Sequence, residues 1–253
     1  MSRLLLLLFA GLKFGKLFFS VGTMLLAVGV YALVFGWRYA VGIVAMLMIH
    51  ELGHFVAARQ RRLPVGWPTF IPFIGAFTQI NQMPHDAETD AYISLGGPLL
   101  GTVGALACYA LGRGTGEPWL VAVSYTGFMI NLINLIPVPP LDGGRITAVL
   151  SPRIWLLGIP ALVALLFYRF SPILLVVLIM AAPYGLAALR GLHGKSPEAR
   201  AYYEVSNRVR WEYAFYYVVL VGFLTMMVHD TEDQLHSVAP VGGVQSSGPA
   251  DNV

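Results

Sequence analysis

The sequence predicts an all-α integral membrane protein, a polytopic bundle of six or seven transmembrane helices with a short re-entrant or hairpin segment after the second one. Of the 253 residues, 57% are hydrophobic and only 11% are charged, whereas soluble domains carry about 25% charged residues. The apolar residues are grouped in runs close to the ~20 residues that cross a bilayer as a helix. These runs lack the alternation of barrel strands, so each is expected to be an α-helix that satisfies its own backbone groups.

The expected elements follow one another along the chain. Residues 1–16 are expected to form an amphipathic or interfacial segment that is retained, because Lys13 and Lys16 occupy the place of a signal-peptide cleavage site. Residues 17–229 are expected to form one membrane domain. Residues 230–253 mix acidic residues with Gly, Ser and Pro, which is typical of a disordered tail. The apolar runs of the membrane domain are 17–35, 39–58, 91–111, 119–136, 154–168, 172–189 and 213–228.

The charges indicate partners and orientation. The net charge is only +3, and the 16 Lys and Arg residues are scattered, so the lipid bilayer is the expected partner and nucleic acid is not. The single cysteine, Cys108, excludes an intrachain disulfide. With seven spans and the N-terminus inside, only Arg38, Arg113 and Arg169 fall outside the cytoplasm. The positive-inside rule therefore places the C-terminal end of the second helix near the cytoplasmic face.

The second apolar run contains a metal-binding pattern, His50-Glu51-Leu52-Gly53-His54. Histidines at i and i+4 lie on one face of a helix, close enough for both imidazoles to reach one zinc ion. Glu51 lies on the adjoining face, where a carboxylate can act as the general base for water. The alternative is that the two histidines and the glutamate are only hydrogen-bonded inside a helix bundle, although ionisable groups at membrane depth are usually functional.

A catalytic zinc site normally has three protein ligands, so a third is needed from elsewhere in the chain. Asp142 directly follows the fourth apolar helix and lies on the same predicted side of the membrane as His54. The prolines before it break the helix, and Gly143 and Gly144 after it permit close approach of the backbone. Asp142 is therefore the expected third ligand of one zinc ion per chain. An ordinary Asp-Gly turn at the membrane surface is the alternative.

These two motifs resemble those of the site-2 protease family of intramembrane zinc metalloproteases. The second one is Asn134-Leu-Ile-Pro-Val-Pro-Pro-Leu-Asp142-Gly, and Gly96-Gly97-Pro98 resembles the segment that opens the family's next core helix. The resemblance covers about residues 39–153. It implies that Asp142 is a zinc ligand and that Asn134, or the nearby Asn131, binds substrate; an interhelical hydrogen bond is the alternative for either. It also implies a compact form, because no stretch here is polar and long enough for a PDZ or nucleotide-sensing domain.

The segment from Pro64 to Ile80 is apolar, broken by prolines and too short to cross the membrane. It is expected to form a re-entrant loop or hairpin beside the metal motif, with a bend at Gly75. Its strands, including Phe73 and Phe77, are candidates to bind an extended substrate by strand addition. The alternative is a membrane-surface anchor without substrate contact.

The sequence therefore predicts a zinc endopeptidase that hydrolyses a transmembrane protein or peptide substrate within or near the bilayer. His50, His54 and Asp142 are the expected metal ligands, and Glu51 is the expected catalytic residue. The alternative is a membrane protein of the same fold that binds partners or metal without cleavage. An intact Glu51 disfavours this alternative, because neither binding nor transport needs a base beside the metal.

Overall fold

The computed structural model describes residues 3–73, 75–79, 82–168, 171–191 and 196–238, and side chains from residue 15 onward. The chain is mainly helical, as predicted. Its elements are α1 (Arg3–Phe35), α2 (Trp37–Gln60), β1 (Thr69–Ile71), β2 (Gly75–Phe77), α3 (Ala87–Thr115), α4 (Pro118–Asn134), α5 (Asp142–Ala148), the 3-10 helix η1 (Pro152–Ile154), α6 (Trp155–Tyr168), α7 (Pro172–Leu189), α8 (Pro197–Tyr202) and α9 (Asn207–Val238).

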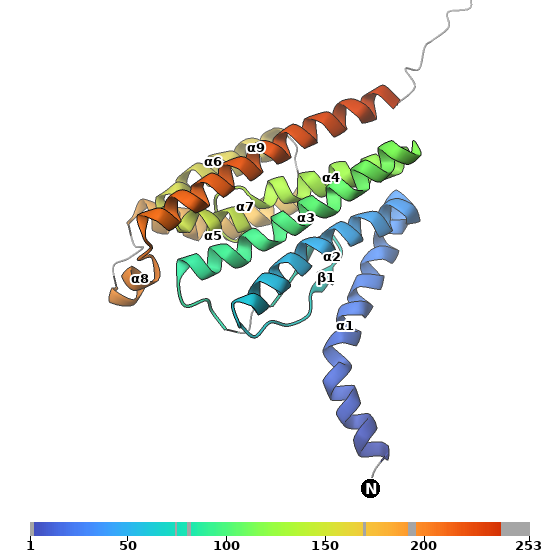
Figure 1. The fold of residues 1–253 in the computed structure, drawn as a ribbon, viewed down its shortest axis with the longest axis horizontal. Coiled ribbons are helices and arrows are strands. Elements are labelled where there is room, and N and C mark those ends of the chain that lie inside the picture. The colour runs from blue at the N-terminus through green and yellow to red at the C-terminus, as the bar shows by residue number, and fades with distance from the viewer. Residues whose placement is uncertain (1–2, 74, 80–81, 169–170, 192–195, 239–253) are drawn as a thin grey trace, which may run out of the picture.

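The long helices form a bundle around α3 and α4 (Figure 1). Helix α3 packs against both α2 and α4, α9 covers α4, and α6 pairs with α7. Helix α1 slants away from the other long helices and contacts the bundle through α2 and β1. Among the described residues, five helices are long and apolar enough to cross a membrane, namely α1, α2, α3, α7 and α9. The apolar helices α4 and α6 are shorter, with 17 and 14 residues.

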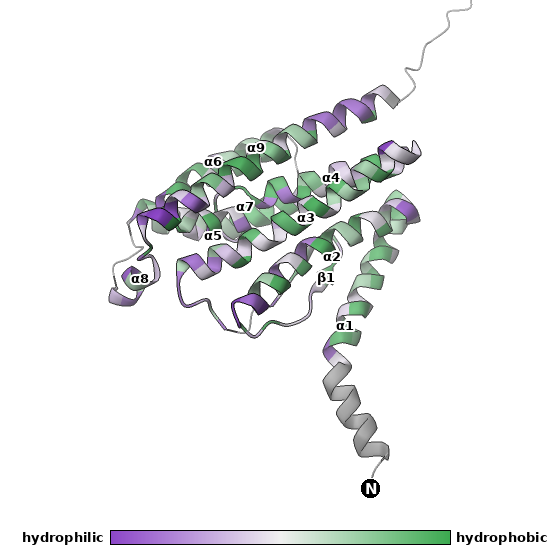
Figure 2. Ribbon diagram, viewed as in Figure 1, coloured by the Kyte–Doolittle hydropathy of each residue, from purple (hydrophilic) through white to green (hydrophobic). Residues whose placement is uncertain are grey.

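The outer surface of the bundle is apolar, as expected for a protein surrounded by lipid. Hydrophobic residues cover most of the helices, while hydrophilic residues gather at helix ends (Figure 2). Large apolar side chains that would be costly to expose to water point outward from the spanning helices. Examples are Leu33, Val103, Ile179 and Val218. The fold and its apolar surface together indicate an integral membrane protein.

Helices α2 and α3 approach unusually closely, because glycines face each other at their crossing. A Cβ atom on Gly53 would lie 2.1 Å from the carbonyl oxygen of Gly96. No larger residue fits at this position without moving one of the helices. The close crossing brings the metal motif of α2 directly against the N-terminal half of α3.

The predicted hairpin is present between α2 and α3. Strands β1 and β2 are antiparallel, with Thr69 opposite Phe77, Phe70 opposite Ala76 and Ile71 opposite Gly75. The turn includes Pro72 and Phe73, and Gly75, where the bend was expected, is the first residue of β2. Gly75 has a φ of 124°, a conformation that glycine adopts readily. Phe70 is fully buried and anchors the hairpin against α1 and α2.

Two helix boundaries differ from the sequence expectation. Helix α1 runs without a break from Arg3 to Phe35, so the described part of the expected interfacial segment belongs to the first long helix. Helix α9 continues to Val238, into the segment expected to be a tail. Polar contacts hold this extension, because Gln234 donates hydrogen bonds to Asp230 and to Tyr109 of α3. The remainder of the expected tail, residues 239–253, lies outside the described residues.

Candidate metal centre

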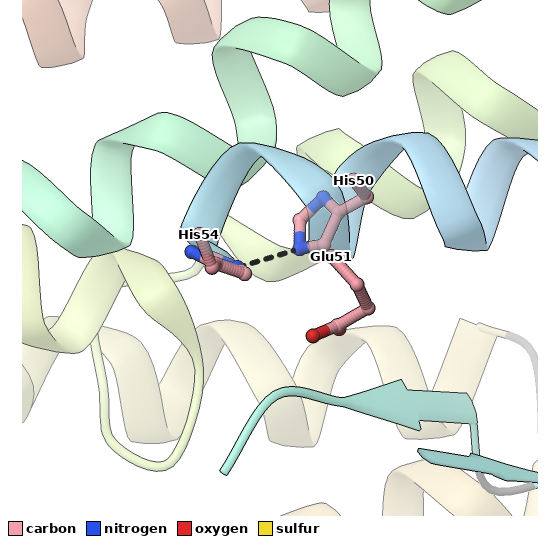
Figure 3. Close-up of side chains that lie close together, drawn as sticks. All are labelled: His50, Glu51 and His54. Carbon is pink, nitrogen blue, oxygen red and sulfur yellow. Dashed lines mark hydrogen bonds between the residues drawn. The ribbon is translucent and has the colours of Figure 1, made fainter. Parts of the chain in front are cut away.

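Helix α2 brings His50, Glu51 and His54 together, as their i and i+4 spacing predicts. Potential ligand atoms of the three side chains all lie within 4.8 Å of one another. The Nε2 atoms of the two imidazoles are 3.1 Å apart, and the Glu51 carboxylate extends beside them toward the hairpin (Figure 3). His50 and Glu51 are 4% and 6% exposed, so the group is buried in the bundle.

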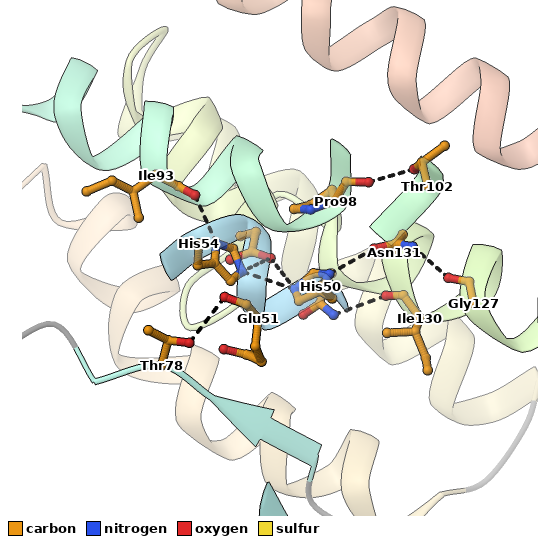
Figure 4. Close-up of polar contacts among 12 residues, drawn as sticks. His50, Glu51, His54, Thr78, Ile93, Pro98, Thr102, Gly127, Ile130 and Asn131 are labelled. Carbon is orange, nitrogen blue, oxygen red and sulfur yellow. Dashed lines mark hydrogen bonds and ion pairs between the residues drawn. The ribbon is translucent and has the colours of Figure 1, made fainter. Parts of the chain in front are cut away.

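The hydrogen bonds around the two imidazoles determine which nitrogen of each ring faces the centre (Figure 4). His54 Nδ1 lies 2.8 Å from the carbonyl oxygen of Ile93, which can only accept, so Nδ1 carries the proton. Asn131 uses its Nδ2 to donate to the Gly127 carbonyl, which leaves Oδ1 to accept from His50 Nδ1 at 2.8 Å. Because Nδ1 of each ring is engaged in these hydrogen bonds, Nε2 of each imidazole faces the other ring, which is the arrangement of metal-binding histidines.

Asp142 completes a triangle of acceptor atoms. Its Oδ2 lies 3.2 Å from His50 Nε2 and 3.3 Å from His54 Nε2. This oxygen is buried, and its contacts with the two imidazoles are the ones described for it. These three atoms face one another at 3.1–3.3 Å, a spacing that requires a proton or a metal ion among them. Donor atoms around a tetrahedral ion with bonds of 2.0–2.1 Å are about 3.3 Å apart, so these three residues fit a zinc ion.

The segment that carries Asp142 is held by backbone contacts. Helix α4 ends at Asn134, the proline-rich turn follows, and α5 begins at Asp142 itself. A Cβ atom on Gly143 would lie 2.1 Å from the carbonyl oxygen of Leu135, so only glycine lets α5 start so close to the end of α4. The indole N–H of Trp155 donates to the Gly144 carbonyl at 2.7 Å and fixes the first turn of α5.

A polar network outside the metal motif also secures α5. Arg145, one turn after Asp142, forms an ion pair with Asp90 of α3 at 3.4 Å, and the hydroxyl of Tyr202 donates to the same carboxylate. Burial and the neighbouring Asp90 carboxylate raise the pKa of Tyr202 above its usual value, so the phenol stays a neutral donor. The sequence analysis did not identify this network, because the three residues come from distant segments with no shared pattern.

A cavity of about 740 Å³ opens onto the metal centre. Glu51 and Asp142 are among its polar lining residues, while apolar residues of α2, α4 and α7 form much of its walls. Oε2 of Glu51 is buried and has no hydrogen-bond partner in the described part of the chain. The apolar lining includes Ile43, Leu47, Met129, Ile133, Leu174 and Val177. A cavity of this size and composition suits an apolar peptide segment.

The residues expected to bind substrate fall into two groups. Phe73, Gly75, Phe77 and Asn134 all line the cavity. Asn131 is 2% exposed and is not among the lining residues. Its side-chain amide forms hydrogen bonds inside the bundle with His50 and with the Gly127 carbonyl. Its position corresponds to the alternative considered from the sequence, an interhelical hydrogen bond, and it orients a candidate ligand.

Gly97 is a second residue whose role at the centre the sequence did not reveal. A Cβ atom at this position would lie 2.3 Å from Nε2 of His54. The imidazole of His54 therefore needs a glycine opposite it on α3. The signal was present in the Gly96-Gly97-Pro98 segment, but the sequence does not tell which side chain occupies the space.

Comparisons with known proteins show what this chain is similar to. Residues 38–125 match the model of peptidase family M50. The chain is 38% identical over 78 residues to "Probable zinc metalloprotease EGY1, chloroplastic" of Arabidopsis thaliana, covering 29% of this chain and 14% of the relative. It is 29% identical over 113 residues to the zinc metalloprotease MJ0392 of Methanocaldococcus jannaschii, covering 42% of this chain and 32% of the relative.

The matches cover less than a third of each of these two relatives. Among solved structures, the site-2 protease from Methanocaldococcus jannaschii aligns with a TM-score of 0.42 and 21% identity, over 73% of this chain and 88% of that one. The family match contains His50, Glu51 and His54, and Asp142 lies beyond it. The resemblance stated from the sequence is confirmed at this level: residues 38–125 match peptidase family M50, and the chain is similar to zinc metalloproteases.

Proposed function

We propose that this protein is an intramembrane zinc endopeptidase that hydrolyses peptide bonds of transmembrane substrates, with His50, His54 and Asp142 as the metal ligands. One observation carries the proposal most directly. A buried carboxylate without a partner, that of Glu51, adjoins a triangle of three acceptor atoms at the polar end of an apolar cavity. Burial of an acid without a partner is unfavourable in free energy, and a protein that only binds its partner does not need such a group.

The residues of the centre divide the chemistry among them. His50, His54 and Asp142 would hold a zinc ion, which would supply polarisation of a carbonyl group and a lower pKa of water. Glu51 accepts the proton of the attacking water and passes it to the leaving amine, so that no covalent enzyme intermediate is needed. Asn134 lines the cavity next to the centre, and its side chain is available to hold the substrate backbone. The apolar walls limit access of other water to the scissile bond.

The hairpin supports binding of an extended substrate through its free edge. The N–H of Phe70 donates to Thr23 of α1, so the backbone groups of Phe70 point away from β2. In an antiparallel pair, two directly opposite residues either both direct their N–H and C=O groups at each other or both direct them outward. Ala76 lies opposite Phe70, so its backbone groups also point outward, away from β1. Ala76 lines the cavity, and no hydrogen bond from another described element reaches its backbone.

The substrate strand therefore pairs with Ala76 in this proposal, and not with the backbone of Phe73 or Phe77. The N–H of Phe73 already donates to Tyr31 at 3.0 Å, and the backbone of Phe77 faces Thr69 within the hairpin. Their side chains are left to contact the side chains of the substrate. An unpaired strand edge at membrane depth is costly, which favours an occupant that supplies donors and acceptors.

The distribution of basic residues supports a metal centre toward the cytoplasmic side of the membrane. Thirteen of the 16 Lys and Arg residues fall on the side where α2 ends and α5 begins, if seven segments span and the N-terminus is inside. The substrate would then be cut near the cytoplasmic end of its transmembrane segment.

The proposed activity is tested with purified protein in detergent, its zinc content and a panel of single-span peptides. Glu51→Gln is expected to keep zinc and lose cleavage, because Glu51 is assigned a proton-transfer role. Asp142→Asn and His54→Ala are expected to lose zinc. Glu212→Gln, the same chemical change on the surface of α9, is the matched control and should leave both properties unchanged. Equal zinc loss in the Glu51 and Asp142 variants would contradict the division of roles.

The role of the hairpin edge is tested separately. Ala76→Pro removes the outward N–H without removing a ladder hydrogen bond, since proline is tolerated on the free side of an edge strand. It is expected to lower cleavage sharply at normal zinc content, while Ala76→Ser, which keeps the N–H, is expected to do much less. If Ala76→Pro cleaves a transmembrane substrate like wild type, the segment is a membrane anchor.

A further inference from the structure

The hairpin has two outer edges, and their neighbours differ. The edge of β2 faces the cavity and lacks a described hydrogen-bonding neighbour, whereas the edge of β1 is covered by α1. Three hydroxyl side chains of α1 make this contact. Ser20 donates to the carbonyl of Pro68, Thr23 accepts from the N–H of Phe70 at 3.2 Å, and Tyr31 accepts from the N–H of Phe73 at 3.0 Å.

These hydroxyl groups lie on one face of α1. At 100° per residue, positions 20, 23 and 31 fall within about 80° of one another around the helix axis. Ser20 and Tyr31 are 3% and 8% exposed, although neighbouring residues such as Phe19 and Leu33 point out of the bundle. A buried polar face on an otherwise apolar helix indicates a specific partner, and that partner is the backbone of the hairpin.

The contact of Tyr31 reaches the turn that leads into β2. Phe73 has a φ of 62°, which non-glycine residues adopt rarely. Its N–H is bound by the Tyr31 hydroxyl, and its ring packs edge-to-face on the Tyr31 ring with centroids 5.3 Å apart. At the other end of the hairpin, the hydroxyl of Thr78 donates to the Glu51 carbonyl at 3.3 Å. The hairpin is thus fixed between α1 and the metal-binding helix.

We propose that α1 positions the substrate-binding edge: the hydroxyls of Thr23 and Tyr31 hold the hairpin so that the outward groups of Ala76 face the Glu51 carboxylate. This inference rests on the proposed function for its consequence in cleavage, but its structural part is independent of activity. Thr23 and Tyr31 are positioning residues, because their hydroxyls bind the backbone of the hairpin; Tyr31 also lines the cavity, so hydrogen exchange is the measurement that reports the positioning role.

The test combines hydrogen exchange with kinetics on Thr23→Val and Tyr31→Phe, which remove one hydroxyl each and keep the shape of the side chain. Loss of one hydrogen bond is expected to speed exchange of the Phe70 and Phe73 amides about three- to tenfold. For a single-span substrate, KM is expected to rise by a similar factor while kcat and zinc content stay unchanged. Adding both substitutions should increase both effects.

Tyr39→Phe is the matched control. It removes a half-buried tyrosine hydroxyl that pairs with Thr126 between α2 and α4, while its ring packs against the same apolar cluster as Phe70 and Tyr31. It should leave exchange of the hairpin and KM as in wild type.

Unchanged exchange in the folded Thr23 and Tyr31 variants would overturn the proposal, and so would faster exchange with an unchanged KM. An equal effect of Tyr39→Phe on the hairpin would also overturn it. A different result would separate the two proposals: the wild-type protein cleaves no membrane substrate, but hydrogen exchange responds as expected. In that case the proposed activity and the substrate role of the hairpin are wrong, whereas the attachment of the hairpin to α1 is supported.

Discussion

Replacement of Asn131 by leucine should weaken zinc binding although Asn131 is no candidate ligand. The asparagine side chain is almost fully buried, and its Oδ1 accepts the Nδ1 proton of His50 at 2.8 Å. Leucine fills a similar volume but leaves this buried N–H without an acceptor, which costs about 1–3 kcal/mol. It also frees the imidazole to adopt the other tautomer.

The size of the effect follows from this contact. Loss of an outer hydrogen bond to a metal-binding histidine typically costs ~10- to 100-fold in metal affinity. This factor corresponds to about 1.4–2.7 kcal/mol, which agrees with the cost of the unpaired N–H. The zinc dissociation constant of Asn131→Leu is therefore expected to rise by one to two orders of magnitude, measured in detergent by competition with a chromophoric chelator.

Asn134→Leu provides the control, because it makes the same change one turn later on α4. The Asn134 amide donates to the Ile130 carbonyl of its own helix and lines the cavity. Zinc affinity should stay at the wild-type level, while cleavage should fall if Asn134 holds the substrate. A folded Asn131→Leu protein with wild-type zinc affinity would refute the assigned role of Asn131, as would an equal loss in the Asn134 variant.

Three further predictions concern the metal centre, the topology and the acid stability. Gly97→Ala should release zinc, because the new Cβ would force the His54 ring to move by at least about 0.7 Å to restore a normal contact. Metal–ligand distances tolerate deviations of only about 0.2 Å. Gly114→Ala is the control: its Cβ would meet open space, so this variant should keep zinc in a metal assay. In a Cys108→Ser background, Glu198→Cys should react with an impermeant thiol reagent from the cytoplasm and Gly114→Cys from the opposite side, and the reverse pattern would overturn the proposed orientation. Burial would raise the pKa of Asp86, but its hydrogen bond with the Thr89 N–H, with smaller contributions from neighbouring groups, lowers it below the usual value. The ionised Asp86 side chain therefore stabilises α3 fully at pH values above the pKa of aspartate in the unfolded chain, and this stabilisation is lost as the pH falls through the lower pKa of Asp86 in the folded protein. Asp86→Ala should therefore lower the free energy of unfolding by about 1 kcal/mol near neutral pH and by progressively less in acid. Thermal unfolding in detergent would measure this difference.

Sequence patterns are most informative where the deciding interactions are local. The long apolar runs predict membrane helices because each helix satisfies its own backbone, and the i and i+4 histidines face the same way on any α-helix. The prolines and Gly75 between α2 and α3 predict a hairpin for the same reason. The end of α9 was misplaced because Tyr109 of α3 takes part in holding its polar residues, and this contact lies far away in the sequence.

The sequence by itself therefore determined the membrane fold, the metal motif on α2 and the hairpin beside it. Only the tertiary structure decided how Asp142 meets the two histidines, since this depends on the turn that ends α4 and on the Gly143 contact. It also separated Asn131, which faces His50, from Asn134, which faces the cavity, because the rotation of α4 about its axis is set by packing against α2 and α3. The outward direction of Ala76 likewise follows from the attachment of β1 to α1. In each case the deciding contact joins segments whose relative position no local pattern encodes.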